Sequence, residues 1–181
     1  REEIIAQQVR VHLAFDRIIA AEEALKQEGF SFDEVFCFPE LVPGANVPHP
    51  LGILCDSALR VVLFKAGEKQ NLNQLQRGVE LAGQLIIAEL QGQYIPVALE
   101  TLLLRSQMHA ALGDERSSLA DVAKALELAE PEGFISTFVE EGLPVAEALR
   151  TLAKQNLAGA VHSDFIKDIL SAFPDAKLAK A

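Results

Sequence analysis

The sequence predicts an all-α fold, arranged as a solenoid of about four helical hairpins. Apolar residues recur at three- and four-residue spacing along most of the 181 residues, the pattern of helices with one buried face. β-branched pairs such as Val61-Val62 and Ile86-Ile87 lie inside these helical patterns, so strand signals are few. Gly67 and Gly113 each mark a short corner between two predicted helices. This repeated helix-corner-helix unit is typical of a solenoid, in which each hairpin packs on the next.

The composition predicts one packed, cytoplasmic domain. Half of the residues are hydrophobic and 23% are charged, which favours a core over disorder. The net charge of −10 repels phosphate groups, so we expect no direct contact with nucleic acid and no membrane binding. No apolar run approaches the roughly 20 residues of a membrane span. Cys37 and Cys55 are too few for a disulfide framework, and we expect both to be reduced.

The N-terminal third predicts two helices and an irregular insertion. Residues 2–13 and 15–28 each carry an apolar face, and Gly29 ends the second segment. The insertion at about 30–50 holds four prolines and four phenylalanines, which break the helical period. Within it we expect one short helical turn at 33–37.

The four phenylalanines of the insertion, at positions 30, 32, 36 and 38, leave two interpretations open. Exposed together, they would form an unfavourable apolar surface. They therefore either fold back over the helix ends as part of the core or form a docking patch for another domain of a parent chain.

The middle of the chain predicts three helices. Residues 51–65 are apolar on nearly every side, so this helix should be central and covered by neighbours. The next helix follows Asn71, a favourable N-cap, and ends at Gly92. The third opens at 94–96 and continues to Gly113.

The C-terminal part predicts four shorter helices. Pro131 suits the first turn of the second of them, and Gly142 suits a C-terminal cap. Pro174 stops the last, so we expect a single domain over 1–174 and a frayed tail or start of a linker at 175–181. The four predicted ranges are 114–129, 131–141, 144–155 and 163–172.

The hairpin 94–130 resembles a tetratricopeptide repeat. Gly113-Asp114 matches the turn between its helices, and Ala125 to Leu128 matches the close-packed end of the second helix. The usual Trp is absent from the chain, and Ser106 stands where the first helix usually has glycine. The resemblance implies a tetratricopeptide-like α-α superhelix.

The run from Ala125 to Gly142 resembles, more specifically, the C-terminal tetratricopeptide-like domain of MalT-type regulators. In that family a helix ending Ala-Leu-x-Leu-Ala-x-Pro-x-Gly-Phe precedes Phe-x-x-Glu-Gly and a short leucine-rich helix. The resemblance covers about 50–173, is strongest over 114–152, and includes a Leu-x-x-Phe pattern ending at Phe173. The matching signature residues are Pro131, Gly133, Phe134, Phe138, Glu141 and Gly142, followed by Ala148, Leu149 and Leu152.

MalT-type regulators are large ATP-dependent transcription factors with a LuxR-type DNA-binding end. This chain contains no P-loop motif and no basic recognition helix, so the resemblance implies an effector-sensing or interaction domain of a longer protein. The start at Arg1 fits that interpretation. Implied partners are a small-molecule effector or a regulatory protein, other domains of the parent chain, and further copies through self-association. The alternative is a stand-alone tetratricopeptide-like scaffold that binds a protein or peptide.

Five polar residues are candidate ligand contacts, because the first helix of each hairpin lines the concave surface of such solenoids. Thr101, Arg105 and His109 recur every four residues and share one helical face. Asp56 and Arg60 do the same on the preceding hairpin. Two arginines and a histidine predict a groove for an anionic or polyhydroxylated small ligand. The alternative is an ordinary solvated face.

No pattern indicates catalysis, a cofactor or a metal. The four histidines are scattered, without a second His or Cys at metal-binding spacing. Glu140 and Glu141 are adjacent on a predicted helix and do not converge on one substrate. Ser117-Ser118 opens a predicted helix and is interpreted as a cap rather than a nucleophile. We therefore expect a protein that is not an enzyme.

Overall fold

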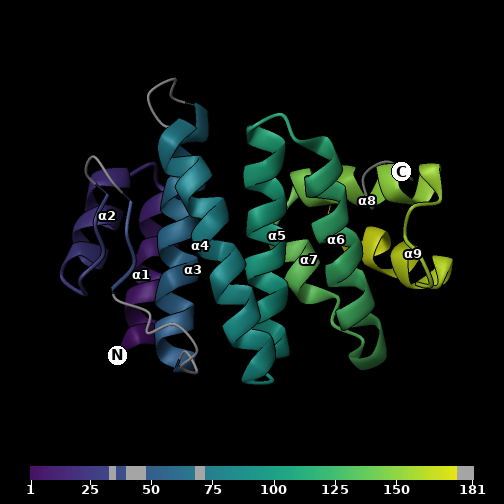
Figure 1. Ribbon diagram of the computed structural model, residues 1–181, viewed down its shortest axis with the longest axis horizontal. Coiled ribbons are helices and arrows are strands. Elements are labelled where there is room, and N and C mark those ends of the chain that lie inside the picture. The colour runs from purple at the N-terminus through teal and green to yellow at the C-terminus, as the bar shows by residue number, and fades with distance from the viewer. Residues whose placement is uncertain (33–35, 40–47, 68–71, 175–181) are drawn as a thin grey trace.

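The computed structural model describes residues 1–32, 36–39, 48–67 and 72–174, and within these ranges the chain is all-α (Figure 1). The prediction of an all-α fold is confirmed. The described residues contain no strand, only an isolated β-bridge. The helices are α1 Glu2–Ala14, α2 Ile18–Lys26, α3 His49–Phe64, α4 Leu72–Gln91, α5 Ile95–Ala111, α6 Glu115–Ala129, α7 Ser136–Glu140, α8 Leu143–Gln155 and α9 Ser163–Ala172.

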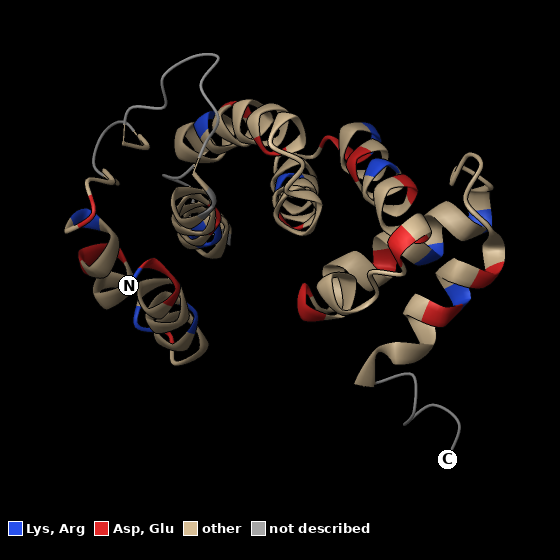
Figure 2. Cartoon of the chain, turned by 90° about the horizontal axis from the view of Figure 1, so that it is seen from below, with Lys and Arg blue, Asp and Glu red and all other residues tan. Residues whose placement is uncertain are grey.

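The helices pack as successive hairpins along a curved row (Figure 2). α1 contacts α2, α3 contacts α4, α5 contacts α6 and α7 contacts α8, which are the pairs that the sequence predicts. The first helices also pack on one another: α1 on α3, α3 on α5, and α5 on α7. They form the inner side of the arc, with α2, α4 and α6 outside, and α9 packs against α7 and α8.

α2 and α3 begin at other residues than the sequence predicts. α2 starts at Ile18 rather than residue 15, because Asp16 has a φ of +58° and cannot continue a right-handed helix. α3 starts at His49, with Pro50 in its first turn, where a missing N–H is tolerated. The predicted N-cap Asn71 and the predicted tail lie outside the described residues.

The phenylalanines of the insertion belong to the core. The Phe36 ring packs against the rings of Phe32 and Phe38, with centroids 5.5 Å apart in both pairs. Phe30, Phe32 and Phe36 are buried in one cluster with residues of α1 to α4. The core interpretation is confirmed, and these three side chains are not exposed for docking.

The predicted helical turn at 33–37 lies largely outside the described residues. Its last residue, Cys37, forms the isolated β-bridge: its N–H donates to the carbonyl oxygen of Ser31 at 3.1 Å, and the Ser31 N–H donates back at 3.2 Å. That end of the segment is extended rather than helical. Cys37 and Cys55 are both free, as the sequence predicts.

Residues 131–141 do not form the single helix that the sequence predicts. α6 instead continues into a 3-10 turn, Glu130–Glu132, which contains Pro131. Gly133 follows with a φ of +69°, a left-handed conformation that ends the turn, so α7 is only a short helix. Gly142 has a φ of +77° and forms the N-cap of α8 directly after α7.

The corner between α5 and α6 follows the predicted turn. Gly113 has a φ of +81°, and the Asp114 side chain caps α6 by accepting the Ser117 N–H at 3.0 Å. The sequence assigned the cap to Ser117-Ser118, and the structure corrects this assignment. Ser118 is buried, with its Oγ 3.1 Å from Oγ of Ser106, so that serine joins the two helices of the hairpin.

In the described ranges, two apolar clusters form the core, and α5 contributes to both. Leu104 and Met108 pack with α1 to α4 and the aromatic segment. Leu99 and Leu103 pack with α6 to α9. α3 lies against α1, α2, α4 and α5, which agrees with its apolar character on nearly every side.

Candidate functional site

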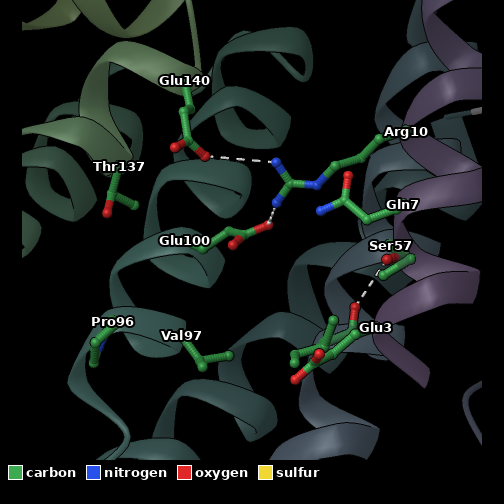
Figure 3. Close-up of a pocket in the computed structure, with 11 residues that line it drawn as sticks. Glu3, Gln7, Arg10, Ser57, Pro96, Val97, Glu100, Thr137 and Glu140 are labelled. Carbon is green, nitrogen blue, oxygen red and sulfur yellow. Dashed lines mark hydrogen bonds and ion pairs between the residues drawn. The ribbon is translucent and has the colours of Figure 1, made fainter. Parts of the chain in front are cut away.

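A polar groove runs between the first helices of the hairpins, and we call it the inner groove. It consists of two adjoining cavities of about 390 and 450 Å³, which share Arg10 of α1 and Glu140 of α7. The first cavity also takes Gln7 of α1, Ser57 of α3 and Glu100 of α5 (Figure 3). The second takes Arg60 of α3, Gln107 of α5 and Glu141. Each inner helix therefore contributes polar side chains to one surface.

Arg10 crosses the inner groove and joins its two sides. Its Nη2 donates to Oε1 of Glu100 at 2.5 Å, and its Nη1 lies 3.6 Å from Oε2 of Glu140 (Figure 3). Arg10 is about one-third exposed, and Glu140 is more exposed still. Water screens such pairs, so their contribution to stability is small and they can be exchanged for contacts with a ligand.

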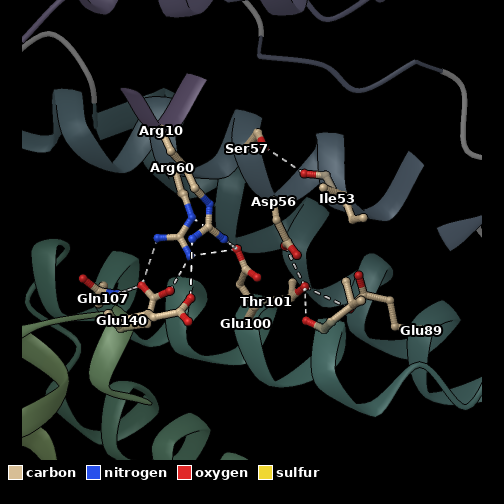
Figure 4. Close-up of polar contacts among 12 residues, drawn as sticks. Arg10, Ile53, Asp56, Ser57, Arg60, Glu89, Glu100, Thr101, Gln107 and Glu140 are labelled. Carbon is tan, nitrogen blue, oxygen red and sulfur yellow. Dashed lines mark hydrogen bonds and ion pairs between the residues drawn. The ribbon is translucent and has the colours of Figure 1, made fainter. Parts of the chain in front are cut away.

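Arg60 forms a more protected set of ion pairs at the floor of the groove (Figure 4). Its Nη2 donates to Oε1 of Glu100 at 2.8 Å and to Oε1 of Glu141, and its Nη1 donates to Oε2 of Glu141 at 3.2 Å. Gln107 also donates to Oε2 of Glu141, at 2.8 Å. Burial acts to lower the pKa of Arg60, but the carboxylates of Glu141 and Glu100 outweigh it and raise that pKa above its ordinary value.

Beneath the groove, α3, α4 and α5 enclose Asp56, Glu89 and Thr101, which we call the buried cluster (Figure 4). The Thr101 hydroxyl lies 2.7 Å from Oδ1 of Asp56 and 2.9 Å from Oε2 of Glu89. Burial, followed by the charges of Glu100 and Glu89, raises the pKa of Asp56 well above its usual range. Burial also raises the pKa of Glu89 to about 8, against the lowering effect of its contact with Thr101.

The two remaining predicted residues face a different helix. Arg105 binds Asp121 of α6 through two hydrogen bonds, of 2.8 Å from Nε and 2.6 Å from Nη2. His109 lies 3.9 Å from the same carboxylate and 3.7 Å from Asp114. These contacts join the two helices of one hairpin.

The structure therefore does not bring the five predicted ligand contacts to one surface. Asp56 and Thr101 are buried, Arg105 and His109 face α6, and Arg60 alone lines the groove. A shared face on one helix does not determine which neighbouring helix that face meets.

Sequence reasoning missed most of the polar residues that line the groove: Gln7, Arg10, Ser57, Glu100, Gln107 and Glu140. One local signal was present, because Glu100 and Gln107 are seven residues apart and therefore lie on the same face of α5. Arg10 gave no such signal, since its partners are on other hairpins.

A metal site and a membrane span each have requirements with which the described residues can be compared. Among them, no three His, Cys, Asp or Glu side chains are grouped so as to hold a metal ion. Within the same ranges, no helix combines the length and the apolar character that crossing a bilayer requires. The groove offers carboxylates, guanidinium groups, amides and hydroxyls, which suits recognition of a polar ligand by hydrogen bonds.

Comparison of the chain with protein-family models, with curated proteins and with solved structures finds no match.

Proposed function

We propose that this chain is the effector-sensing and interaction domain of an ATP-dependent LuxR-type transcription regulator of the MalT type, acting in the cytoplasm. The inner groove is its binding surface. One observation carries the proposal: ion pairs between the first, second, third and fourth hairpins all meet in that groove, through Arg10, Arg60, Glu100 and Glu141. A molecule that binds there contacts every hairpin at once.

The tetratricopeptide-like superhelix is part of the proposal. It is supported by the packing of each first helix on the next and by the Gly113-Asp114 turn. The MalT-like signature is supported by the roles of its residues: Gly133 and Gly142 take positive φ, Phe138 is fully buried, and Glu141 binds Arg60. Each of these roles suits the residue type that the signature contains.

The groove favours a neutral, polyhydroxylated ligand over an anion. Both arginines are already paired with carboxylates, and the exposed acidic groups Glu3 and Glu140 add negative charge. Hydroxyl groups can donate to these carboxylates and accept from the guanidinium groups. A ligand that replaces the Arg10–Glu140 contact changes the attraction between the outermost hairpins, which is a route from binding to self-association.

Thermal-shift measurements with a panel of neutral sugars, polyols and phosphorylated metabolites test this proposal. A ligand at 100 times its Kd stabilises the folded protein by about 2.7 kcal/mol. The shift should disappear in Gln7→Ala and Glu140→Gln, whose exposed side chains line the groove, and persist in Lys167→Gln on α9. A ligand that binds both groove variants as tightly as the unchanged protein would overturn the assignment of the site.

A stand-alone scaffold for a protein or peptide is the second candidate, because the two cavities adjoin at Arg10 and Glu140 and form one open groove. The coding DNA on both sides of this segment separates the candidates. A P-loop module upstream and a helix-turn-helix downstream support the regulator. A start codon and a stop codon immediately flanking the segment would contradict the regulator and favour the scaffold.

A further inference from the structure

The buried cluster contains more acceptor atoms than its single hydroxyl can serve. Asp56 and Glu89 are each 1% exposed, and Thr101 is fully buried between them. The Thr101 hydroxyl lies within hydrogen-bond distance of both carboxyl groups and of the Val97 carbonyl oxygen, at 3.1 Å. It has only one hydrogen to donate, yet it lies close to three oxygen atoms that can accept one.

The number of hydrogens around Thr101 indicates how many protons the two carboxyl groups carry. If the hydroxyl donates to one carboxylate, the short contact with the other requires that second group to be protonated and to donate to Oγ1 of Thr101. If the hydroxyl donates to Val97, both carboxyl groups must donate. If both carboxylates were ionised, one carboxylate oxygen would face the hydroxyl oxygen of Thr101 with no hydrogen between them, and their lone pairs would repel. The geometry therefore favours at least one carboxylic proton, because the two contacts with carboxyl oxygens are the shortest of the three.

The surroundings offer little compensation for a second negative charge. Within the described part of the chain, Oδ2 of Asp56 and Oε1 of Glu89 are buried without a hydrogen-bond partner. α3 contributes Arg60, one turn after Asp56, which favours ionised Asp56, but that guanidinium group also binds Glu100 and Glu141. α3 also contributes Cys55, and burial together with the charges of Asp56 and Glu89 raises the pKa of its thiol.

The charged groups on the other helices do not neutralise the cluster. On α5, the Glu100 carboxylate disfavours ionisation of both Asp56 and Glu89. From α1, Arg10 binds Glu100 rather than the cluster. Arg105 of α5 is already paired with Asp121 of α6. α4 itself contributes Glu89.

We propose that Asp56, Glu89 and Thr101 form a proton-dependent lock between α3, α4 and α5. At least one carboxyl group is protonated while α4 is packed, and loss of that proton places two buried charges side by side and loosens α4 from its neighbours. This lock does not depend on the proposed function, because it concerns the stability of the free chain.

The direction of the pH dependence follows from the protonation states. The Glu89 pKa is about 8 in the folded chain, against an ordinary value of 4.5. Between these values the folded state retains a proton that the unfolded state has released, so stability falls as pH rises. The contribution is fully present below about 4.5 and is lost as pH passes through about 8.

Infrared difference spectroscopy on the unchanged protein tests the proton count directly. A carbonyl stretch of a protonated carboxylic acid should be present at pH 6.5, where exposed carboxyl groups are ionised, and should disappear on titration to pH 9. Absence of that band at pH 6.5 would overturn the proposal, whatever the behaviour of any variant.

Thermal unfolding of Glu89→Gln between pH 5.5 and 8.5 tests the lock. Glutamine has the shape of the neutral acid but does not titrate, so the melting temperature of the variant should fall less with pH than that of the unchanged protein. Glu80→Gln removes an exposed carboxylate from the same helix and should keep the original slope. Equal slopes in all three proteins would overturn the proposal. If Glu89→Gln does not fold, the infrared titration decides.

Discussion

Arg60 of α3 donates from Nη1 and Nη2 to the two carboxylate oxygens of Glu141, the residue directly after α7 and 81 positions further along the chain. The Glu141 side chain is 2% exposed, so this ion pair lies in an environment that water screens weakly. It joins the second hairpin to the fourth along the inner side of the arc.

Replacing Glu141 by alanine should therefore destabilise the fold, by about 2–3 kcal/mol, because it leaves Arg60 and Gln107 with fewer buried acceptors. Glu140→Ala is the matched control, since the neighbouring carboxylate is 59% exposed and should contribute about 0.5 kcal/mol or less. Urea unfolding measures both. Equal losses of stability would contradict the importance assigned to the buried pair.

Phe36→Ala should cost about 3–4 kcal/mol, because this ring is fully buried against Phe32 and Phe38. Phe15→Ala removes a ring that is 69% exposed and should change the free energy of unfolding by less than about 0.5 kcal/mol. Urea unfolding of the pair separates a structural role of the aromatic segment from a docking role. Unchanged stability of Phe36→Ala would restore the docking interpretation.

Gly133→Ala should destabilise the corner after α6 by about 1 kcal/mol, because alanine is strained at a φ of +69°. A Cβ at this position meets no atom within 4 Å, so the loss would come from backbone strain rather than a steric clash. Gly133→Asn should recover part of the loss, since asparagine tolerates left-handed conformations. Chemical denaturation of both variants tests this, and an asparagine variant no more stable than the alanine variant would contradict it.

The cap of α6 should weaken at acidic pH. Hydrogen bonds from the side chain and backbone of Ser117 hold the pKa of Asp114 below its ordinary value of 3.8. Its ionised form therefore stabilises the folded state above that value, and the contribution is lost as pH falls through the lowered pKa. The gap in melting temperature between the unchanged protein and Asp114→Ala should narrow from pH 7 towards pH 3. Asp114→Asn keeps an uncharged acceptor at the cap. If the difference in melting temperature between the unchanged protein and Asp114→Asn did not depend on pH, an ionic cap would be contradicted.

Helical periodicity predicted the fold class, the hairpin pairs and most of the helices, because each depends on the spacing of apolar residues within one segment. It failed at 131–141, where Gly133 breaks a pattern that otherwise continues. It also failed after Asp16, a residue type that only occasionally adopts the left-handed conformation found here.

The candidate site was less predictable because its contacts join residues distant in sequence. Glu89 was missed, since a carboxylate next to an apolar stripe is usually solvated. Its burial follows from its place opposite Asp56 and Thr101. Arg60, a predicted ligand contact, lines the groove, but its partners Glu100 and Glu141 are not on its own helix. Arg105 was assigned to the groove because nothing local showed that Asp121 lies beside it.

α5 has buried side chains in both apolar clusters, with Leu104 and Met108 on one side and Leu99 and Leu103 on the other. Neither half of the arc can lose its packing against α5 without exposing apolar side chains of α5 itself. Repeat proteins with weaker interfaces can fray from one end, one unit at a time. Here the amide protons of α3 and of α6 should exchange with solvent through the same global opening, so that the chain melts in a single transition.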